Sequence, residues 1–168
     1  MIHVCSLAAL TETVRRTGAS HVLTVMANVD QVQRPASVLP ANHLKISFDD
    51  IIEPIDGYVA PTAEHVEQML TFVRGWDRNA PLVIHCYAGV SRSTASAFAA
   101  ACALNPHRDE MEIARKIRAA SPIASPNRLI VGLADTALGR DGRMLRALDD
   151  IGPATMMVEG KPFLLELD

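Results

Sequence analysis

The sequence has few cysteines, no excess of positive charge and no long apolar run, and each shortage excludes a class of protein. Its 168 residues hold three widely spaced cysteines, Cys5, Cys86 and Cys102. This spacing excludes a disulfide framework and a zinc site built from cysteine pairs, and it favours a reducing, cytoplasmic setting. The longest uncharged stretch, residues 93–107, is too short and polar to cross a bilayer, and the N-terminus lacks the pattern of an export signal.

The overall composition is that of one globular domain. The net charge is −3, so no overall positive field attracts nucleic acid or an anionic membrane, and we expect neither as a partner. Hydrophobic residues make up 49% and charged residues 21%, a balance that excludes a disordered or coiled-coil chain. The sequence leaves the oligomeric state open.

Strand-like and helix-like segments alternate along the chain. Apolar and β-branched patterns predict strands at residues 1–6, 21–26, 43–48 and 81–85. Helical periodicity and caps predict helices at residues 7–17, 62–76, 93–104, 109–120, 126–138 and 143–150. This alternation predicts an α/β three-layer sandwich, with a mostly parallel central sheet of four to five strands flanked by helices.

Three local expectations accompany this fold. We expect residues 1–150 to form a single domain, and residues 151–168 to be an extension that packs on it as a small hairpin or docking strand. Ser125 is the predicted cap of the helix at 126–138, with Pro126 in its first turn. The basic cluster Arg115-Lys116-Ile-Arg118 is interpreted as a solvated helix face.

One segment carries the pattern of a catalytic site, His85-Cys-Tyr-Ala-Gly-Val-Ser-Arg-Ser93. It places Cys86 at the carboxyl end of a predicted buried strand, where open α/β sheets bind ligands, and a helix begins just beyond it. The loop amides and the start of that helix can converge on one anion, and the guanidinium of Arg92 can bind two of its oxygens. The same groups favour a thiolate at Cys86, which would be a nucleophile beneath a bound phosphate or sulfate. The predicted anion-binding residues are Tyr87, Ala88, Gly89, Val90, Ser91 and Arg92.

These residues resemble the His-Cys-x5-Arg-Ser/Thr signature of the cysteine-based protein tyrosine phosphatases, and the form His-Cys-x-Ala-Gly-x-Ser-Arg-Ser resembles the dual-specificity branch. The order of predicted elements extends the resemblance over about residues 1–138. It implies phosphoester hydrolysis through a cysteinyl-phosphate, on a phosphorylated protein or a small phosphoester, with no cofactor. The histidines show no metal-ligand spacing, so we expect no metal site.

The resemblance also implies a proton donor on a separate loop, after the strand that precedes the long helix. Asp49 and Asp50 occupy that place. We favour Asp50 as the general acid over Asp49, and Asp56 is a third candidate. The alternative is that this pair of aspartates simply ends the strand and caps a turn.

Three further roles are carried over from the same family. Ser93 matches the hydroxyl that assists departure of the cysteine, although it could serve only as a residue of the first helical turn. His85 matches the histidine that orients the loop and helps hold the thiolate, and the alternative is a satisfied core histidine. Asn127 matches an asparagine that supports the loop. Ser91 is expected to shape the loop rather than to react.

Other functions stay open at this point. The loop has no lysine, which disfavours an inositol phosphate or phosphoinositide substrate without excluding it. A catalytically weak phosphate-binding protein is a second alternative, and sulfur or arsenate chemistry of the rhodanese or arsenate-reductase kind is a third. Cys5 and Cys102 are expected to be inert buried thiols, unless one of them resolves an oxidised Cys86.

Overall fold

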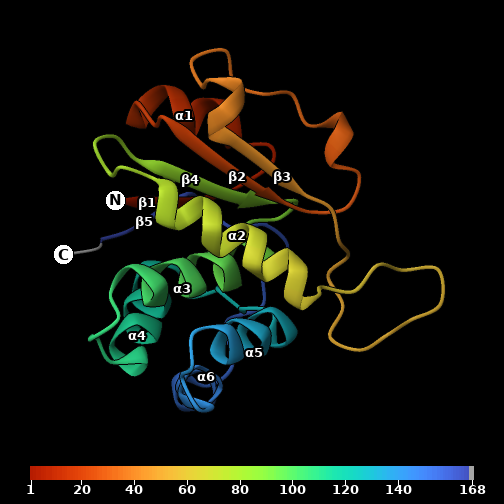
Figure 1. Ribbon diagram of the computed structural model, residues 1–168, viewed down its shortest axis with the longest axis vertical. Helices are drawn as coiled ribbons and strands as arrows, with labels where there is room; N and C mark the ends of the chain where they lie inside the picture. The colour runs from red at the N-terminus through yellow and green to blue at the C-terminus, as the bar shows by residue number, and fades with distance from the viewer. Residues whose placement is uncertain (167–168) are drawn as a thin grey trace.

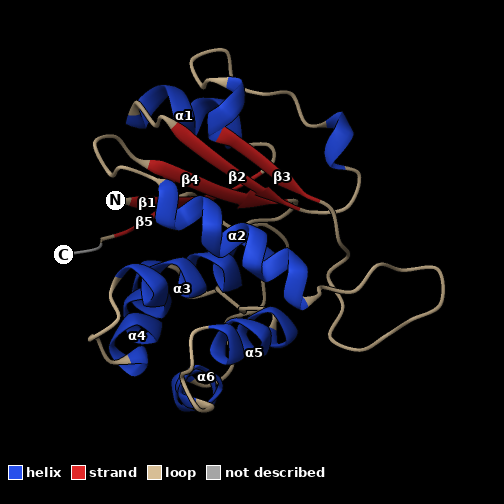
Figure 2. Ribbon diagram, viewed as in Figure 1, coloured by secondary structure: helices blue, strands red, loops and turns tan. Residues whose placement is uncertain are grey.

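The computed structural model of the protein describes residues 1–166, which fold around one five-stranded sheet (Figures 1 and 2). The strand order is β3-β2-β4-β1-β5. The first four strands in the chain are parallel: β1 (Ile2–Ser6), β2 (His21–Val25), β3 (His43–Ile46) and β4 (Leu82–Cys86). The last, β5 (Phe163–Leu165), is antiparallel to β1. The predicted α/β fold with a mostly parallel sheet is confirmed.

Helices cover both faces of this sheet, as Figure 1 shows. One face packs against α1 (Leu10–Thr17), and the other against α2 (Ala63–Gly75) and α3 (Arg92–Leu104). The remaining helices, α4 (Glu110–Ala120), α5 (Arg128–Ala137) and α6 (Arg143–Ile151), pack outside α3. Because both faces are covered, the central strands β2 and β4 are buried along nearly their whole length rather than on alternate residues.

The helix α3 is the centre of the larger core. Its residues 92–102 are all buried, and most of them are small. Small side chains let the helix lie between the sheet and the outer helices, so the predicted buried core helix is confirmed. None of the helices within residues 1–166 is long and apolar enough to cross a membrane.

Two predicted helix starts are wrong, and in each case a side chain sets the true boundary. The amide of Ala9 donates to Ser6 Oγ at 3.3 Å, which makes a turn, and α1 begins only at Leu10. The cap of α5 is Asn127 and not Ser125, because the Asn127 side-chain oxygen accepts hydrogen bonds from the first free amides of the helix.

The C-terminal segment returns across the molecule to the sheet edge. Arg118 does not lie on a solvated face as predicted, because its guanidinium donates to the carbonyls of Ile151, Gly152 and Pro153. From there the chain runs to β5, whose Leu165 lies opposite Ile2 of β1. Residues 151–166 thus supply the fifth strand, and Leu167 and Asp168 lie outside the described residues.

Candidate active site

The loop between β4 and α3 turns its carbonyl oxygens outward. Cys86 is the last residue of β4 and Arg92 the first of α3. Five carbonyl oxygens of this segment are held by groups outside it. The Cys86 carbonyl accepts a hydrogen bond from His85 Nδ1, and the Tyr87 carbonyl accepts one from the amide of Leu7. The carbonyls of Ala88, Val90 and Ser91 accept from the amides of Gly160, Ser125 and Asn127. A trans peptide directs its C=O and the next N–H to opposite sides, so the loop amides face inward. Inward amides of this kind make an anion-binding nest.

Glycine is required at position 89. Its φ is +72°, and a Cβ there would lie 2.8 Å from backbone atoms of Cys5 and Ser6 at the end of β1. Both the left-handed backbone and the lack of space exclude a side chain. The loop therefore rests directly on β1, which fixes its distance from the sheet.

The sulfur of Cys86 lies inside this nest. It accepts a hydrogen bond from the amide of Gly89 at 3.3 Å and lies 3.1 Å from Ser93 Oγ. Cys86 is 2% exposed and Ser93 is fully buried. The sulfur therefore has one backbone amide and one hydroxyl within hydrogen-bonding distance.

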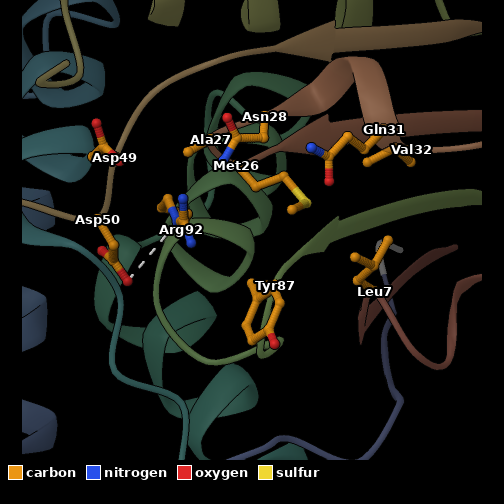
Figure 3. Close-up of a pocket in the computed structure, with 10 residues that line it drawn as sticks. All are labelled: Leu7, Met26, Ala27, Asn28, Gln31, Val32, Asp49, Asp50, Tyr87 and Arg92. Carbon is orange, nitrogen blue, oxygen red and sulfur yellow. Dashed lines mark ion pairs between the residues drawn. The ribbon is translucent and has the colours of Figure 1, made fainter. Parts of the chain in front are cut away.

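Arg92 has a hydrogen-bond donor that the protein leaves unused. Its Nη1 donates to the carbonyl of Phe48 at 3.0 Å. Its Nε is buried and takes no hydrogen-bond partner among residues 1–166; the Asp50 carboxylate lies 3.9 Å away, an ion-pair distance only. Because an unpaired buried donor is costly, this N–H is poised for an oxygen that a ligand would supply. Figure 3 shows the Arg92 side chain beside Asp50, with the ion pair dashed.

The two adjacent aspartates do different things. Asp50 Oδ1 accepts hydrogen bonds from Ser91 Oγ and from Asn127 Nδ2, both at 2.8 Å, so its carboxylate is held against the loop. Asp49 Oδ2 accepts from the amide of Val59 at 2.8 Å and closes the base of the following loop. Both line the pocket in front of Arg92, whereas Asp56 is exposed and does not line it.

His85 belongs to a buried hydrogen-bonded chain that the sequence did not reveal. Its Nδ1 lies 3.3 Å from the carbonyl of Cys86, and its Nε2 lies 2.7 Å from Thr24 Oγ1, which is 2.8 Å from His43 Nε2. A carbonyl only accepts, so Nδ1 of His85 carries the proton and Nε2 accepts from Thr24. Burial lowers the pKa of His85 to about 4, and burial together with nearby cations lowers the pKa of His43 to about 4.

His85 therefore contacts the backbone of Cys86 and not its sulfur. The signal for this chain lies in the strand register, where Thr24 and His85 are directly paired across β2 and β4. That register is known only once the sheet is built.

The pocket in front of the loop has an uncharged wall. Its volume is about 370 Å³. Besides Asp49, Asp50, Arg92 and the exposed Tyr87, it is lined by Leu7, Met26, Ala27, Asn28, Gln31 and Val32 (Figure 3). The loop after β2 contributes most of these residues. Among residues 1–166, Arg92 is the only cationic side chain that lines this pocket.

The C-terminal segment braces the loop from behind. The amide of Gly160 donates to the carbonyl of Ala88 at 2.8 Å, and Ser6 Oγ donates to the carboxylate of Glu159 at 2.6 Å. A Cβ at position 160 would lie 2.8 Å from the carbonyl oxygen of Gly89. The close approach of the two backbones explains why position 160 is a glycine, and no pattern in the local sequence predicts this contact.

The other two cysteines are buried and do not line the pocket. Cys5, Cys86 and Cys102 are all free thiols. Burial raises the pKa of Cys5 and of Cys102 to about 12, so both are protonated at neutral pH. Within residues 1–166, no group of three or more histidine, cysteine or acidic side chains is placed to hold a metal ion.

Comparisons with known proteins give a family match and a set of similar folds. Residues 6–108 match the family described as "Polymorphic toxin system, DSP-PTPase phosphatase". A search of curated proteins finds no match.

Several solved structures share the fold at low sequence identity. DUSP15 is 18% identical with a TM-score of 0.66, covering 89% of this chain and 90% of its own. The PTP-2 phosphatase of Cydia pomonella is 19% identical with a TM-score of 0.64, covering 80% and 84%. The Yvh1 phosphatase domain of Chaetomium thermophilum is 18% identical with a TM-score of 0.64, covering 85% and 93%.

Proposed function

The chain belongs to the DSP-PTPase phosphatase family of polymorphic toxin systems, and from this membership we propose that it hydrolyses phosphate monoesters through a cysteinyl-phosphate on Cys86. One observation carries the proposal: the amide of Gly89 donates to the Cys86 sulfur at 3.3 Å, and Arg92, at the other end of the same loop, has a buried Nε with no hydrogen-bond partner among residues 1–166. A phosphoryl group bound by this loop would accept hydrogen bonds from the Arg92 Nε–H and from the inward loop amides. The nucleophile would then already be in contact with phosphorus.

In the first step, the Cys86 thiolate attacks phosphorus and forms an S–P bond as the P–O bond to the leaving group breaks. The loop amides and Arg92 stabilise the charge on the three equatorial oxygens. Asp50 gives its proton to the leaving oxygen, which departs as an alcohol or phenol. The position of Asp50 supports this role, because its Oδ2 takes no hydrogen bond from residues 1–166 and faces Arg92.

In the second step, water attacks the cysteinyl-phosphate. The Asp50 carboxylate takes the proton from water, the S–P bond breaks, and inorganic phosphate leaves. Ser93 Oγ, at 3.1 Å from the sulfur, donates a hydrogen bond to the departing thiolate. The positive charge that the phosphoryl group requires comes from Arg92 and the loop dipoles.

The supporting residues keep this geometry in place. Asn127 both caps α5 and donates to Asp50, so it ties the acid to the helix beside the loop. Ser91 holds the same carboxylate from the loop itself. His85 fixes the first peptide of the loop through the carbonyl of Cys86.

The decisive experiment traps the intermediate. Asp50→Ala is mixed with p-nitrophenyl phosphate, whose good leaving group lets the first step proceed without an acid, and the reaction is quenched in acid. Intact-mass and peptide mass spectrometry should find one added phosphoryl group, on Cys86, and none in the Asp50→Ala/Cys86→Ser double variant. A phosphatase activity that persists in Cys86→Ser would overturn the mechanism.

A further inference from the structure

A second hollow opens on the other side of Asp50 from the phosphate pocket. It is a groove of about 650 Å³ between the loop of residues 51–60, which projects at the right of Figure 1, and the start of α5. Its apolar lining comes from Ile51, Ile52, Ile55 and Pro126. Asp50 lines both the groove and the phosphate pocket, so the two hollows share a wall.

The loop beside this groove, residues 51–60, exposes large apolar side chains. Ile52, Ile55, Tyr58 and Val59 are 57%, 50%, 58% and 55% exposed. Two of these four residues, Ile52 and Ile55, line the groove, and exposed large apolar side chains gathered on one loop are typical of a binding surface. The loop is also fixed in shape, because the Asp49–Val59 backbone and side-chain bonds close its base.

The charge around the groove indicates what could occupy it. Residues 49–60 contain four acidic side chains and no basic one. The one cation of the groove, Arg128, is paired with Asp149 at 2.7 Å. Carboxylates at this density repel a polyanionic headgroup and attract a basic segment.

We propose that this groove is a subsite for an aliphatic side chain of a polypeptide substrate, close in sequence to the phosphorylated residue, with basic residues of the same substrate lying against the loop. The inference rests on the proposed function. A small phosphoester fills only the phosphate pocket, whereas an extended chain advances about 3.3 Å per residue and leaves that pocket across Asp50. The residue a few positions away then enters the groove.

The test measures kcat/KM on matched phosphotyrosine peptides. Both series carry lysines around the phosphotyrosine, and they differ only at nearby positions that are leucine or isoleucine in the first series and glycine in the second. The protein should prefer the first series by about tenfold or more, the value of one buried aliphatic side chain. The double variant Ile52→Ser/Ile55→Ser should lose that preference while its kcat/KM for p-nitrophenyl phosphate is unchanged.

A matched control is Leu39→Ser, which removes an aliphatic side chain that is 65% exposed but does not line the groove. It should keep the preference. Glu53→Lys should lower kcat/KM on the lysine-containing peptides and spare p-nitrophenyl phosphate.

The outcomes separate this proposal from the function on which it rests. If the unmutated protein does not hydrolyse p-nitrophenyl phosphate, the proposed function itself is wrong. Normal hydrolysis with no peptide preference, or a preference that the double variant retains, overturns the subsite alone. Faster turnover of inositol phosphates or of phosphoinositide vesicles than of any peptide also overturns it.

Discussion

The hydroxyl of Ser93 lies 3.1 Å from the sulfur of Cys86, within the buried first turn of α3. The contact joins Cys86, the last residue of β4, to Ser93, the second residue of α3. The position of α3 relative to the sheet therefore sets the distance between sulfur and hydroxyl. A hydroxyl in this place can donate to a thiolate but is shielded from solvent. It is therefore expected to matter most when sulfur is the leaving group.

Ser93→Ala should slow the second step by roughly 10- to 100-fold, the loss of a hydrogen bond to a charged group. The first step should change little, so a burst of p-nitrophenol should precede a slow steady state in stopped-flow measurements. Ser96→Ala is the matched control, because its hydroxyl is also buried in α3 but donates to the Arg92 carbonyl. Equal slowing of burst and steady state in Ser93→Ala would contradict the assignment.

Asp50→Asn should lower kcat by roughly 10²- to 10⁴-fold on an alkyl phosphate, and less on p-nitrophenyl phosphate, because only a poor leaving group needs the proton. Asp49→Asn is the control, since its amide oxygen can still accept from Val59. A leaving-group series fitted for both variants separates them. Steeper leaving-group dependence in Asp49→Asn than in Asp50→Asn would transfer the role to Asp49.

Gly160→Ala should impair catalysis by displacing the loop between β4 and α3, which Gly160 contacts on its outer side. A Cβ at position 160 would lie 2.8 Å from the Gly89 carbonyl oxygen, so either the loop between β4 and α3 or the C-terminal segment around Gly160 must move. A small displacement of the loop costs roughly tenfold or more in kcat. Gly75→Ala is the control, because a Cβ there meets nothing within 4 Å. Circular dichroism checks that both variants fold. Full activity in a folded Gly160→Ala protein would show that the brace is dispensable.

Stability should fall as the pH is lowered from about 6.5 towards 4. The unfolded chain protonates His85 near its ordinary pKa of 6.5, whereas burial keeps the folded pKa at about 4. In this window the unfolded state binds more protons, so its population rises as pH falls. His85 contributes a slope of about 1.4 kcal/mol per pH unit, and His43, whose folded pKa is also about 4, adds its own contribution. Above pH 6.5 the full contribution is present.

Urea denaturation at several pH values measures that slope. His85→Gln should remove the His85 contribution and leave that of His43, even if the variant is less stable throughout. His107→Gln, which changes an exposed histidine, should leave it as it is. A slope that His85→Gln does not alter would assign the acid sensitivity to other groups.

The sequence was sufficient for the fold and for the positions of Cys86 and Arg92 at the two ends of one loop. Cys86 and Arg92 are joined by one loop, and the alternation of strands and helices determines which end of β4 bears it. The choice between Asp49 and Asp50 is only a preference at that level. The structure distinguishes the two aspartates by their contacts, because Ser91 and Asn127 both donate hydrogen bonds to Asp50 from two other parts of the chain.

What the sequence could not reveal depends on contacts between distant segments. Ser6 and Glu159 are 153 positions apart, and no periodicity or motif links them. Thr24 joins His43 to His85 only because β2 lies between β3 and β4. The Ser125 cap was wrongly predicted because Ser-Pro is a good helix start by itself, whereas Asn127 also bonds Asp50.

The position of β5 beside β1 has a consequence for biosynthesis. β1 leaves the ribosome long before β5 does, and its outer edge stays unpaired until Phe163–Leu165 emerge. At about 5–20 residues per second, the nascent chain spends several seconds with the nucleophile's loop made but unbraced. Phosphatase activity should therefore appear late, when translation of this segment is complete.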